Sequence, residues 1–538
     1  MTDTRARSAR ISSLVILGAL LVGGLVIDAT DDSGGGGTSH VVEAGVAMPA
    51  ARAEPTLAST WYCAAGTAAP GGFGDHVVIL LNPSERARTA TITALAGAIA
   101  PPPAAATAAN GGTTSSTSKA TSSTKATTST APTTTTTSPA GPPTADVSLP
   151  PHSRVVYKMS TLAQAPLVSA IIEVDGGLVS VEHELTGDLG RATAPCSTTV
   201  SSSWSFPWGV TTRGNRELLV FMNPFPDDAT VDVAFATDEG VRNTVRFSGF
   251  VVPGRSVVGA YVDEDVTRKE QVSAQVTVRG GRLVVDRVAT FTAIDGREGL
   301  TVGLGAPVSA ETWMFPDGLT GPGLAEQIVV YNPGTRVAET QVEVRLDDPD
   351  TNGVPEPFEL TVPPGRYAIL NLQEEDRIPA GVGHSSLVRS VNGVPVVAER
   401  AVAATEGASR KGVSTALGSP LAAPTWYFPG GGTSAERDEW ITLFNESDDQ
   451  KVTFSITAMA GGQELAVQDL QDVELAPGAR ITIRIGDHIL REDLPLMVTA
   501  DGPVVAERGL YRGGGGKGLS QSIGIPLAVK TVVPARLG

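Results

Sequence analysis

Hydrophobic and polar residues alternate with a period of two along most of the chain, which is the pattern of β-strands with one buried face. Residues 341–346 read Gln-Val-Glu-Val-Arg-Leu, and residues 452–457 read Val-Thr-Phe-Ser-Ile-Thr. Residues 77–81, 218–222 and 328–331 are apolar at every position, which is typical of strands covered on both faces. No segment after residue 27 shows a sustained helical period. The pattern therefore predicts an all-β chain with little helix.

The strand pattern is repeated four times, with the same landmarks in the same order. The first landmark is a tryptophan motif at Trp61, Trp204, Trp313 and Trp426, which reads Trp-x-Phe-Pro in the last three copies. An apolar run ending in Asn follows, at Asn82, Asn223, Asn332 and Asn445. A Pro-containing turn then precedes a basic residue, and an acid followed by a base closes the series: Glu182-His183, Asp286-Arg287, Glu399-Arg400 and Glu507-Arg508. The chain is therefore expected to be a repeat protein.

Each repeat is long enough for a β-sandwich, because the Trp motifs of the later copies lie about 110 residues apart. About seven strands per repeat are expected, arranged as an immunoglobulin-like antiparallel sandwich, with the Pro turn closing a hairpin. The predicted repeats cover residues 58–200, 201–309, 310–422 and 423–538. The final copy ends soon after a worn version of the Trp strand, which hints that neighbouring repeats are coupled.

The first repeat carries an insertion at residues 99–145 that consists almost wholly of Ala, Thr, Ser, Pro and Gly. Such a composition cannot form a core, so this segment is predicted to be disordered. In an exported protein it would serve equally well as an O-glycosylated spacer or as a bare loop.

The N-terminus predicts export. Residues 1–10 carry three arginines, and residues 11–27 are free of charge, so a single transmembrane signal-anchor with a cytoplasmic tail is favoured. No convincing cleavage site follows, although a cleaved signal peptide and secretion remain the alternative. Residues 28–57 are predicted to be a flexible stalk. The formal charge of −17 argues against nucleic acid as a partner.

The two cysteines of the chain, Cys63 and Cys196, lie at the two ends of the first repeat. Outside the membrane such a pair is expected to be oxidised, so we predict a structural disulfide. A redox or metal site is the alternative, but the chain has no CxxC spacing and its six histidines are scattered singly.

The acid–base pairs could be read as catalytic carboxylates, but four copies of one pair indicate a recurring structural ion pair across strands. The expected structural pairs are formed by Asp286, Arg287, Glu399, Arg400, Glu507 and Arg508. The four Trp residues are candidate ligand-facing platforms for sugars, with a sandwich-core role as the commoner alternative. No catalytic, cofactor-binding or metal-binding residues are predicted, and no cofactor is expected.

With the anchor, the Trp-x-Phe-Pro motif, the apolar-Asn-Pro run and the Pro-Gly-Arg turn, the chain resembles an actinobacterial family of exported proteins of unknown function. The resemblance covers nearly everything after residue 57 and carries no known activity. Asn445-Glu446 in place of Asn-Pro, and Cys63 in place of Phe, depart from the pattern.

Two functional hypotheses follow. The first is a non-enzymatic cell-envelope protein, a membrane-tethered β-sandwich array that acts as extracellular scaffold, spacer or adhesion surface. The second is an array of carbohydrate-binding modules that holds cell-wall or capsular glycan. The expected partners are the membrane, through the N-terminal helix, and cell-wall glycan or another envelope protein.

Overall fold

The computed structural model describes residues 41–102, 141–408, 410–512, 516–528 and 530–532, and regular structure in these residues is almost entirely β-strand. Its helical segments are α2 (Pro349–Asn352) and the 3-10 turns η1 (Met159–Thr161), η2 (Leu372–Glu374) and η3 (Ile485–Asp487). The prediction of an all-β chain with little helix is confirmed. The predicted cytoplasmic tail (1–10) and transmembrane segment (11–27) lie outside the described residues, as does most of the insertion, at 103–140.

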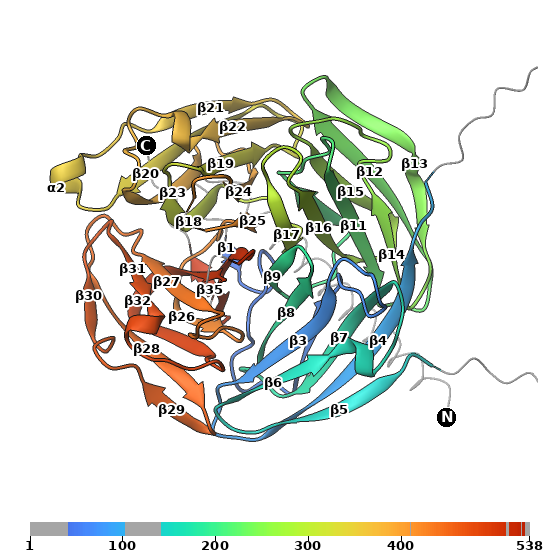
Figure 1. Cartoon of the computed structure of the whole chain (residues 1–538), viewed down its shortest axis with the longest axis horizontal. Coiled ribbons are helices and arrows are strands. Elements are labelled where there is room, and N and C mark those ends of the chain that lie inside the picture. Colours follow the sequence, from blue (N-terminus) through green and yellow to red (C-terminus); the bar gives the residue numbers. More distant parts are fainter. Residues whose placement is uncertain (1–40, 103–140, 409, 513–515, 529, 533–538) are drawn as a thin grey trace, which may run out of the picture. The chain divides into compact units, whose positions relative to one another are not determined.

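The strands of the compact unit Glu43–Thr531 fall into four sets, here called modules 1 to 4, coloured from blue through green and yellow to red in Figure 1. Module 1 contains β2 (Ala58–Cys63), β3 (Asp75–Asn82), β4 (Arg88–Ile99), β5 (Thr144–Leu149), β6 (Ser153–Lys158), β7 (Leu167–Asp175), β8 (Ser180–Gly187) and β9 (Gly190–Pro195). Module 2 contains β10 (Ser203–Phe206), β11 (Asn215–Asn223), β12 (Ala229–Thr237), β13 (Gly240–Val252), β14 (Ser256–Tyr261), β15 (Ser273–Gly280), β16 (Val284–Thr292) and β17 (Glu298–Leu304).

Module 3 contains β18 (Thr312–Leu319), β19 (Leu324–Tyr331), β20 (Ala338–Leu346), β21 (Phe358–Val362), β22 (Tyr367–Asn371), β23 (Gly383–Ser390), β24 (Val397–Ala404) and β25 (Gly412–Leu417). Module 4 contains β26 (Ala423–Phe428), β27 (Asp438–Phe444), β28 (Val452–Ala460), β29 (Gln463–Ala466), β30 (Val473–Leu475), β31 (Arg480–Arg484), β32 (Leu496–Tyr511), β33 (Leu519–Ile523) and β34 (Ile525–Pro526). Strands β1 (Val41–Glu43) and β35 (Lys530–Val532) pair with each other.

All four modules share one strand order. Module 3 shows it most simply, as two four-stranded antiparallel sheets in the orders β18-β23-β20-β21 and β22-β19-β24-β25. In module 4, β32 is long enough to supply one strand to each sheet, and β29 and β30 together take the place of one strand. The sheets of modules 1 and 2 are also joined by parallel pairing of β4 with β14.

The module therefore differs from the expected immunoglobulin-like sandwich of about seven strands. Each sheet of module 3 has four strands, and their order is not that of an immunoglobulin domain. The sequence-based count missed the last strand of each module: β9, β17, β25 and β33. β9, β25 and β33 show no sustained alternation of large apolar residues, whereas β17 does alternate, through Leu300, Val302 and Leu304, and was missed despite that signal.

The core of each module lies between its two sheets. In module 3, Trp313 and Phe315 from one sheet pack with Ile328 and Val330 from the other. The fully apolar runs are indeed central strands covered on both sides. In β11, Leu219 and Phe221 point into the core of module 2, whereas Leu218 and Val220 face module 1. The modules therefore pack against each other through hydrophobic surface.

The Asn landmark fixes the loop that follows each central strand. Asn332 is fully buried, and its Nδ2 donates to the carbonyl oxygens of Arg336 and Val362 at 2.7 and 2.8 Å. Its Oδ1 accepts the N–H of Gly334 at 2.9 Å. Asn82, Asn223 and Asn445 make equivalent bonds.

Two local predictions are corrected. The Pro turn does not close a hairpin, because the strands it joins, such as β21 and β22, belong to different sheets. Residues 44–51, within the predicted flexible stalk, are largely buried. Ala51 bonds to module 4, where its N–H donates to Pro526 at 2.9 Å and its carbonyl accepts from Ala528 at 2.7 Å. The stalk interpretation failed because Ala and Gly composition is the same in a flexible linker and in a tightly packed segment.

Candidate functional site

The four acid–base pairs meet at the junctions between modules, where each base contacts the acid of the next module. Arg287 of module 2 binds Glu399 of module 3, and Arg400 of module 3 binds Glu507 of module 4. Arg508 of module 4 then binds Glu182 of module 1, and His183 of module 1 faces Asp286 of module 2. The pairs therefore form a closed circuit that joins the last module to the first.

The junction between modules 4 and 1 shows the geometry clearly. Arg508 donates from Nη1 and Nη2 to the two carboxylate oxygens of Glu182, at 3.1 and 2.9 Å, in a bidentate pair. Its Nη1 also donates to the carbonyl oxygen of Gly430 at 2.8 Å, and Glu182 accepts the N–H of the same residue. Both side chains of the pair are almost completely buried. Arg287 and Arg400 repeat this arrangement with the carbonyl oxygens of Trp208 and Asp317.

A second buried acid lies beside each arginine, at Glu217, Glu326 and Glu439. Burial would lower the pKa of Arg508, but Glu182 and Glu439 raise it above its ordinary value. Burial also raises the pKa of Glu439 to about 7, against the opposing effect of Arg508. The glycine two positions after Pro429, Gly431, leaves the space for Glu439, since a Cβ there would overlap the carboxylate.

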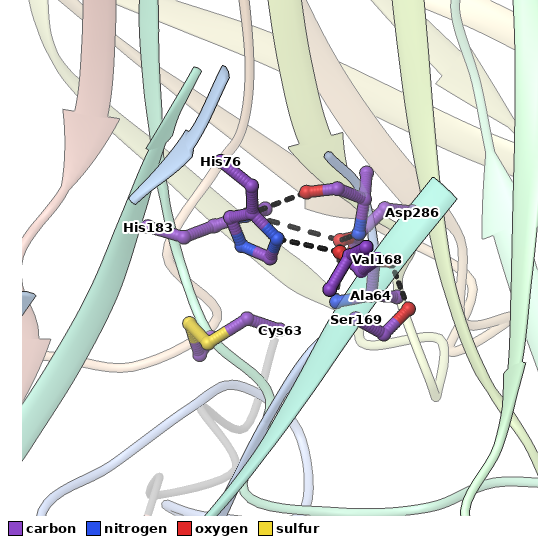
Figure 2. The surroundings of a disulfide bond; sticks show 9 residues. Cys63, Ala64, His76, Val168, Ser169, His183 and Asp286 are labelled. Atoms are coloured by element: carbon purple, nitrogen blue, oxygen red, sulfur yellow. Dashed lines mark hydrogen bonds and ion pairs between the residues drawn. A yellow bond between two sulfur atoms is a disulfide. The ribbon is translucent and has the colours of Figure 1, made fainter. Parts of the chain in front are cut away.

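The junction between modules 1 and 2 has a different chemistry (Figure 2). His183 takes the arginine position and His76 takes the position of the second acid, with their rings 5.3 Å apart between centroids. Nδ1 of His76 lies 2.6 Å from the carbonyl oxygen of Val168, and Nδ1 of His183 lies 3.1 Å from that of Ala65. Each Nδ1 must therefore carry the hydrogen, which leaves Nε2 of His183 as an acceptor 3.7 Å from Oδ2 of Asp286.

Charge at this junction is suppressed by burial. Burial lowers the pKa of His76 to about 4 and that of His183 to about 3. Burial also raises the pKa of Asp286 to about 7, although its Oδ2 accepts the backbone N–H groups of Ala64 and Ala65 at 3.1 and 2.8 Å. At neutral pH the two histidines are thus neutral, and the first junction lacks the ion pair of the other three.

The disulfide belongs to the same set of changes. In modules 2 to 4 the Phe of the Trp motif packs against a glycine after the last strand, as Phe206 does on Gly305, where a Cβ would overlap the ring. In module 1 the corresponding positions are Cys63 and Cys196, which form the expected disulfide. The disulfide thus joins the two segments that the other modules hold together by packing Phe on Gly. In the same module His183 stands where the other modules have an arginine.

The predicted site residues are therefore corrected in two respects. The ion pairs join different modules and are not cross-strand pairs within one sandwich, because neighbouring acid and base point to opposite junctions. The four Trp side chains are at most 1% exposed, so they do not offer the ligand-facing platforms that were considered. The indole N–H groups of Trp204, Trp313 and Trp426 donate to Leu283, Val396 and Val504, each three residues before an acid of the circuit.

Sequence reasoning missed His76, Glu217, Glu326 and Glu439. The available signal was their common position in the sequence. Each lies at the start of a central strand, six residues before the landmark Asn, and eight to ten residues after a glycine that follows the Trp motif. Within the described ranges, no group of three or more His, Cys, Asp or Glu side chains could hold a metal ion. No helix in this part of the chain is long and apolar enough to cross a membrane.

Comparison with known proteins adds a family match. Residues 173–411 match a family described as "Family of unknown function (DUF5719)". No curated protein matches the chain. A crystal structure of Thermotoga maritima 1070 is 23% identical and is aligned over 21% of this chain and 94% of that protein, with a TM-score of 0.18. The matched family residues begin in β7 of module 1 and end just before β25 of module 3.

Proposed function

We propose that this protein is a non-enzymatic scaffold of the cell envelope, in which four repeated β-sandwich modules are locked together to present a rigid extracellular spacer or adhesion surface. One observation carries the proposal. The charged residues that the repeats have in common are buried at the junctions, where they bind each other and backbone groups. Groups used in this way stabilise an assembly and do not face a substrate.

The disulfide supports an extracellular location. In this proposal residues 11–27 anchor the chain in the membrane with the N-terminus in the cytoplasm, and secretion after signal cleavage is the alternative. The partner is another envelope protein or cell-wall glycan. The glycan-binding alternative loses its original basis, because the four Trp rings lie inside the cores.

The location is tested by fractionating cells that produce the full chain with a C-terminal tag and treating intact cells, or spheroplasts, with protease. We expect the tag in the membrane fraction and degraded by external protease. A tag that stays protected in the soluble cytoplasm would contradict the proposal. The non-enzymatic role is tested by incubating the purified chain with glycan and peptide panels, where turnover that is lost on mutation of a single residue would refute it.

A further inference from the structure

The junction between modules 4 and 1 shares the arginine–glutamate pair of two others, but an arginine lies beside it at a position that is apolar in modules 2, 3 and 4. One position near the start of the last strand of each module directly follows a glycine. This position is apolar and buried in three modules, where it is Leu300, Val413 or Leu519. In module 1 the same position is Arg191, with a side chain 37% exposed. The four positions are equivalent, because each pairs across the sheet with the residue that lies three positions after the base of the module's acid–base pair.

Module 4 faces Arg191 with two further arginines. Arg512 takes the position of Phe291 in module 2 and Ala404 in module 3, both of which belong to apolar clusters at their own junctions. Arg437 takes the position of Leu324, which packs into the second of these clusters. Three arginines thus meet at the positions that hold Leu519, Ala404 and Leu324 at the junction between modules 3 and 4.

The surrounding carboxylates do not match these arginines one to one. Glu184 binds both Arg191, at 3.2 Å, and Arg437, at 3.3 Å. Arg512 contacts Glu436 at 3.5 Å, and Glu436 is largely exposed. Burial lowers the pKa of Arg191, and repulsion from Arg437 and Arg512 acts in the same direction, against Glu184.

The space between these side chains is a cavity of about 200 Å³, lined by Arg191, Arg437, Arg512, Glu436 and the hydroxyl-bearing Thr193 and Ser520. Thr193 is 3% exposed, and its Oγ1 has no hydrogen-bond partner among the described residues. A buried hydroxyl without a partner, next to an excess of guanidinium groups, is a site prepared for a ligand that accepts hydrogen bonds.

We propose that this cavity binds a small molecule that carries a carboxylate or phosphate group. Guanidinium groups match both anions through paired hydrogen bonds, and the hydroxyl of Thr193 can donate a further one. Arg191 comes from module 1, whereas Arg437 and Arg512 come from module 4. A bound anion therefore bridges the junction that connects the two ends of the repeat series. The source is either an acidic sugar, such as a uronate, or a free phosphate compound.

The test is calorimetric titration of the full chain with sodium glucuronate and, separately, with sodium phosphate, against sodium chloride at equal ionic strength. We expect saturable binding of at least one anion to the natural chain. In Arg191→Leu the affinity for that anion should fall by about tenfold or more, since one charge-assisted hydrogen bond is worth about that factor. The anion that binds identifies the source. Leu is the residue of modules 2 and 4 at this position, so the variant is compatible with the fold.

The proposal is overturned if neither anion binds more strongly than chloride, or if Arg191→Leu binds as the natural chain does. A melting temperature close to that of the natural chain shows that Arg191→Leu is folded. Should the variant be unfolded, Arg512→Ala replaces it, because the Arg512 side chain is 53% exposed and its removal leaves no cavity in a core. Undiminished binding by Arg512→Ala would then overturn the proposal.

Discussion

Replacing Arg400 with Met removes the charge from one junction and keeps most of the side-chain volume. Arg400 and Glu507 are each at most 1% exposed, and the guanidinium donates to both carboxylate oxygens and to the carbonyl oxygen of Asp317. After the substitution Glu507 keeps the N–H of Asp317 but is buried without a countercharge. Breaking one partner of a buried pair costs about 3–5 kcal/mol, so Arg400→Met should lower the free energy of unfolding by that amount.

The assay is urea denaturation followed by Trp fluorescence, since the buried indoles report the loss of the cores. The matched control is Lys451→Met, which removes an ion pair with Glu474 in which both side chains are more than 60% exposed. That change should leave the stability nearly unchanged, because solvent screens exposed pairs.

The pH dependence provides an internal check. Burial already raises the pKa of Glu507 to about 7 in the natural chain, against the opposing effect of Arg400. Without Arg400 this pKa rises further above that of the unfolded chain, so protonation on acidification restores more stability to Arg400→Met than to the natural chain. The stability difference between the variant and the natural chain should therefore shrink from pH 8 to pH 5. A stability loss below about 1 kcal/mol, or a difference that does not change with pH, would mean that Arg400 and Glu507 do not form a buried ion pair.

Three further predictions concern module 1 and the Asn landmark. Cys63→Ala/Cys196→Ala should lower the free energy of unfolding in urea by about 3–5 kcal/mol. Cys63→Phe/Cys196→Gly, which copies the Phe and Gly of the other modules, should lower it by less. Equal losses would contradict the equivalence of the disulfide and the Phe–Gly contact. Because burial lowers the pKa of His76 from 6.5 to about 4, its neutral form stabilises the fold above pH 6.5 and this contribution is lost toward pH 4. His76→Gln should therefore gain about 3 kcal/mol relative to the natural chain between pH 7 and pH 4, and a constant difference in a pH series would contradict this. Asn332→Ala leaves buried carbonyl and N–H groups without partners and should cost about 2–3 kcal/mol, measured in the same way; a neutral effect would be inconsistent with its three bonds.

The hydrophobic pattern predicted the strands well where alternation or a fully apolar run was present, as in β20 and β11. It failed for β25, whose Gly, Ser and Thr residues lie against neighbouring modules and not in a hydrophobic core. Hydroxyl groups connect these last strands, as between Gln521 N and Ser414 Oγ at 2.8 Å. Strands that pair through side chains leave no periodic signal in a single sequence.

The repeated acid–base pairs were visible in the sequence, but their partners were not. The fourfold repetition of the pair predicts cross-strand ion pairs within each sandwich, although adjacent residues such as Glu399 and Arg400 point to opposite sides of their strand. In the structure their opposite directions lead to two different junctions, toward Arg287 and Glu507. Local spacing cannot reveal this arrangement, because it depends on how four modules are placed around one another.

Two replacements in module 1, Cys for Phe and His for Arg, are visible when the four sets of landmarks are aligned. Cys63 stands where the other motifs have Phe, and His183 stands where the other pairs have Arg. Their joint meaning required the structure, since only there do Cys196, His76 and Asp286 join them at one junction.

Module 4 contacts module 1 in this structure, and a double-mutant cycle on Glu182 and Arg508 measures that contact. These residues lie 326 positions apart in sequence and form the bidentate pair that closes the circuit. We expect Glu182→Gln, Arg508→Met and the double variant to give a coupling energy of about 2 kcal/mol or more in urea denaturation. A coupling energy near zero, as expected for modules arranged in an open row, would show that modules 4 and 1 do not make this contact.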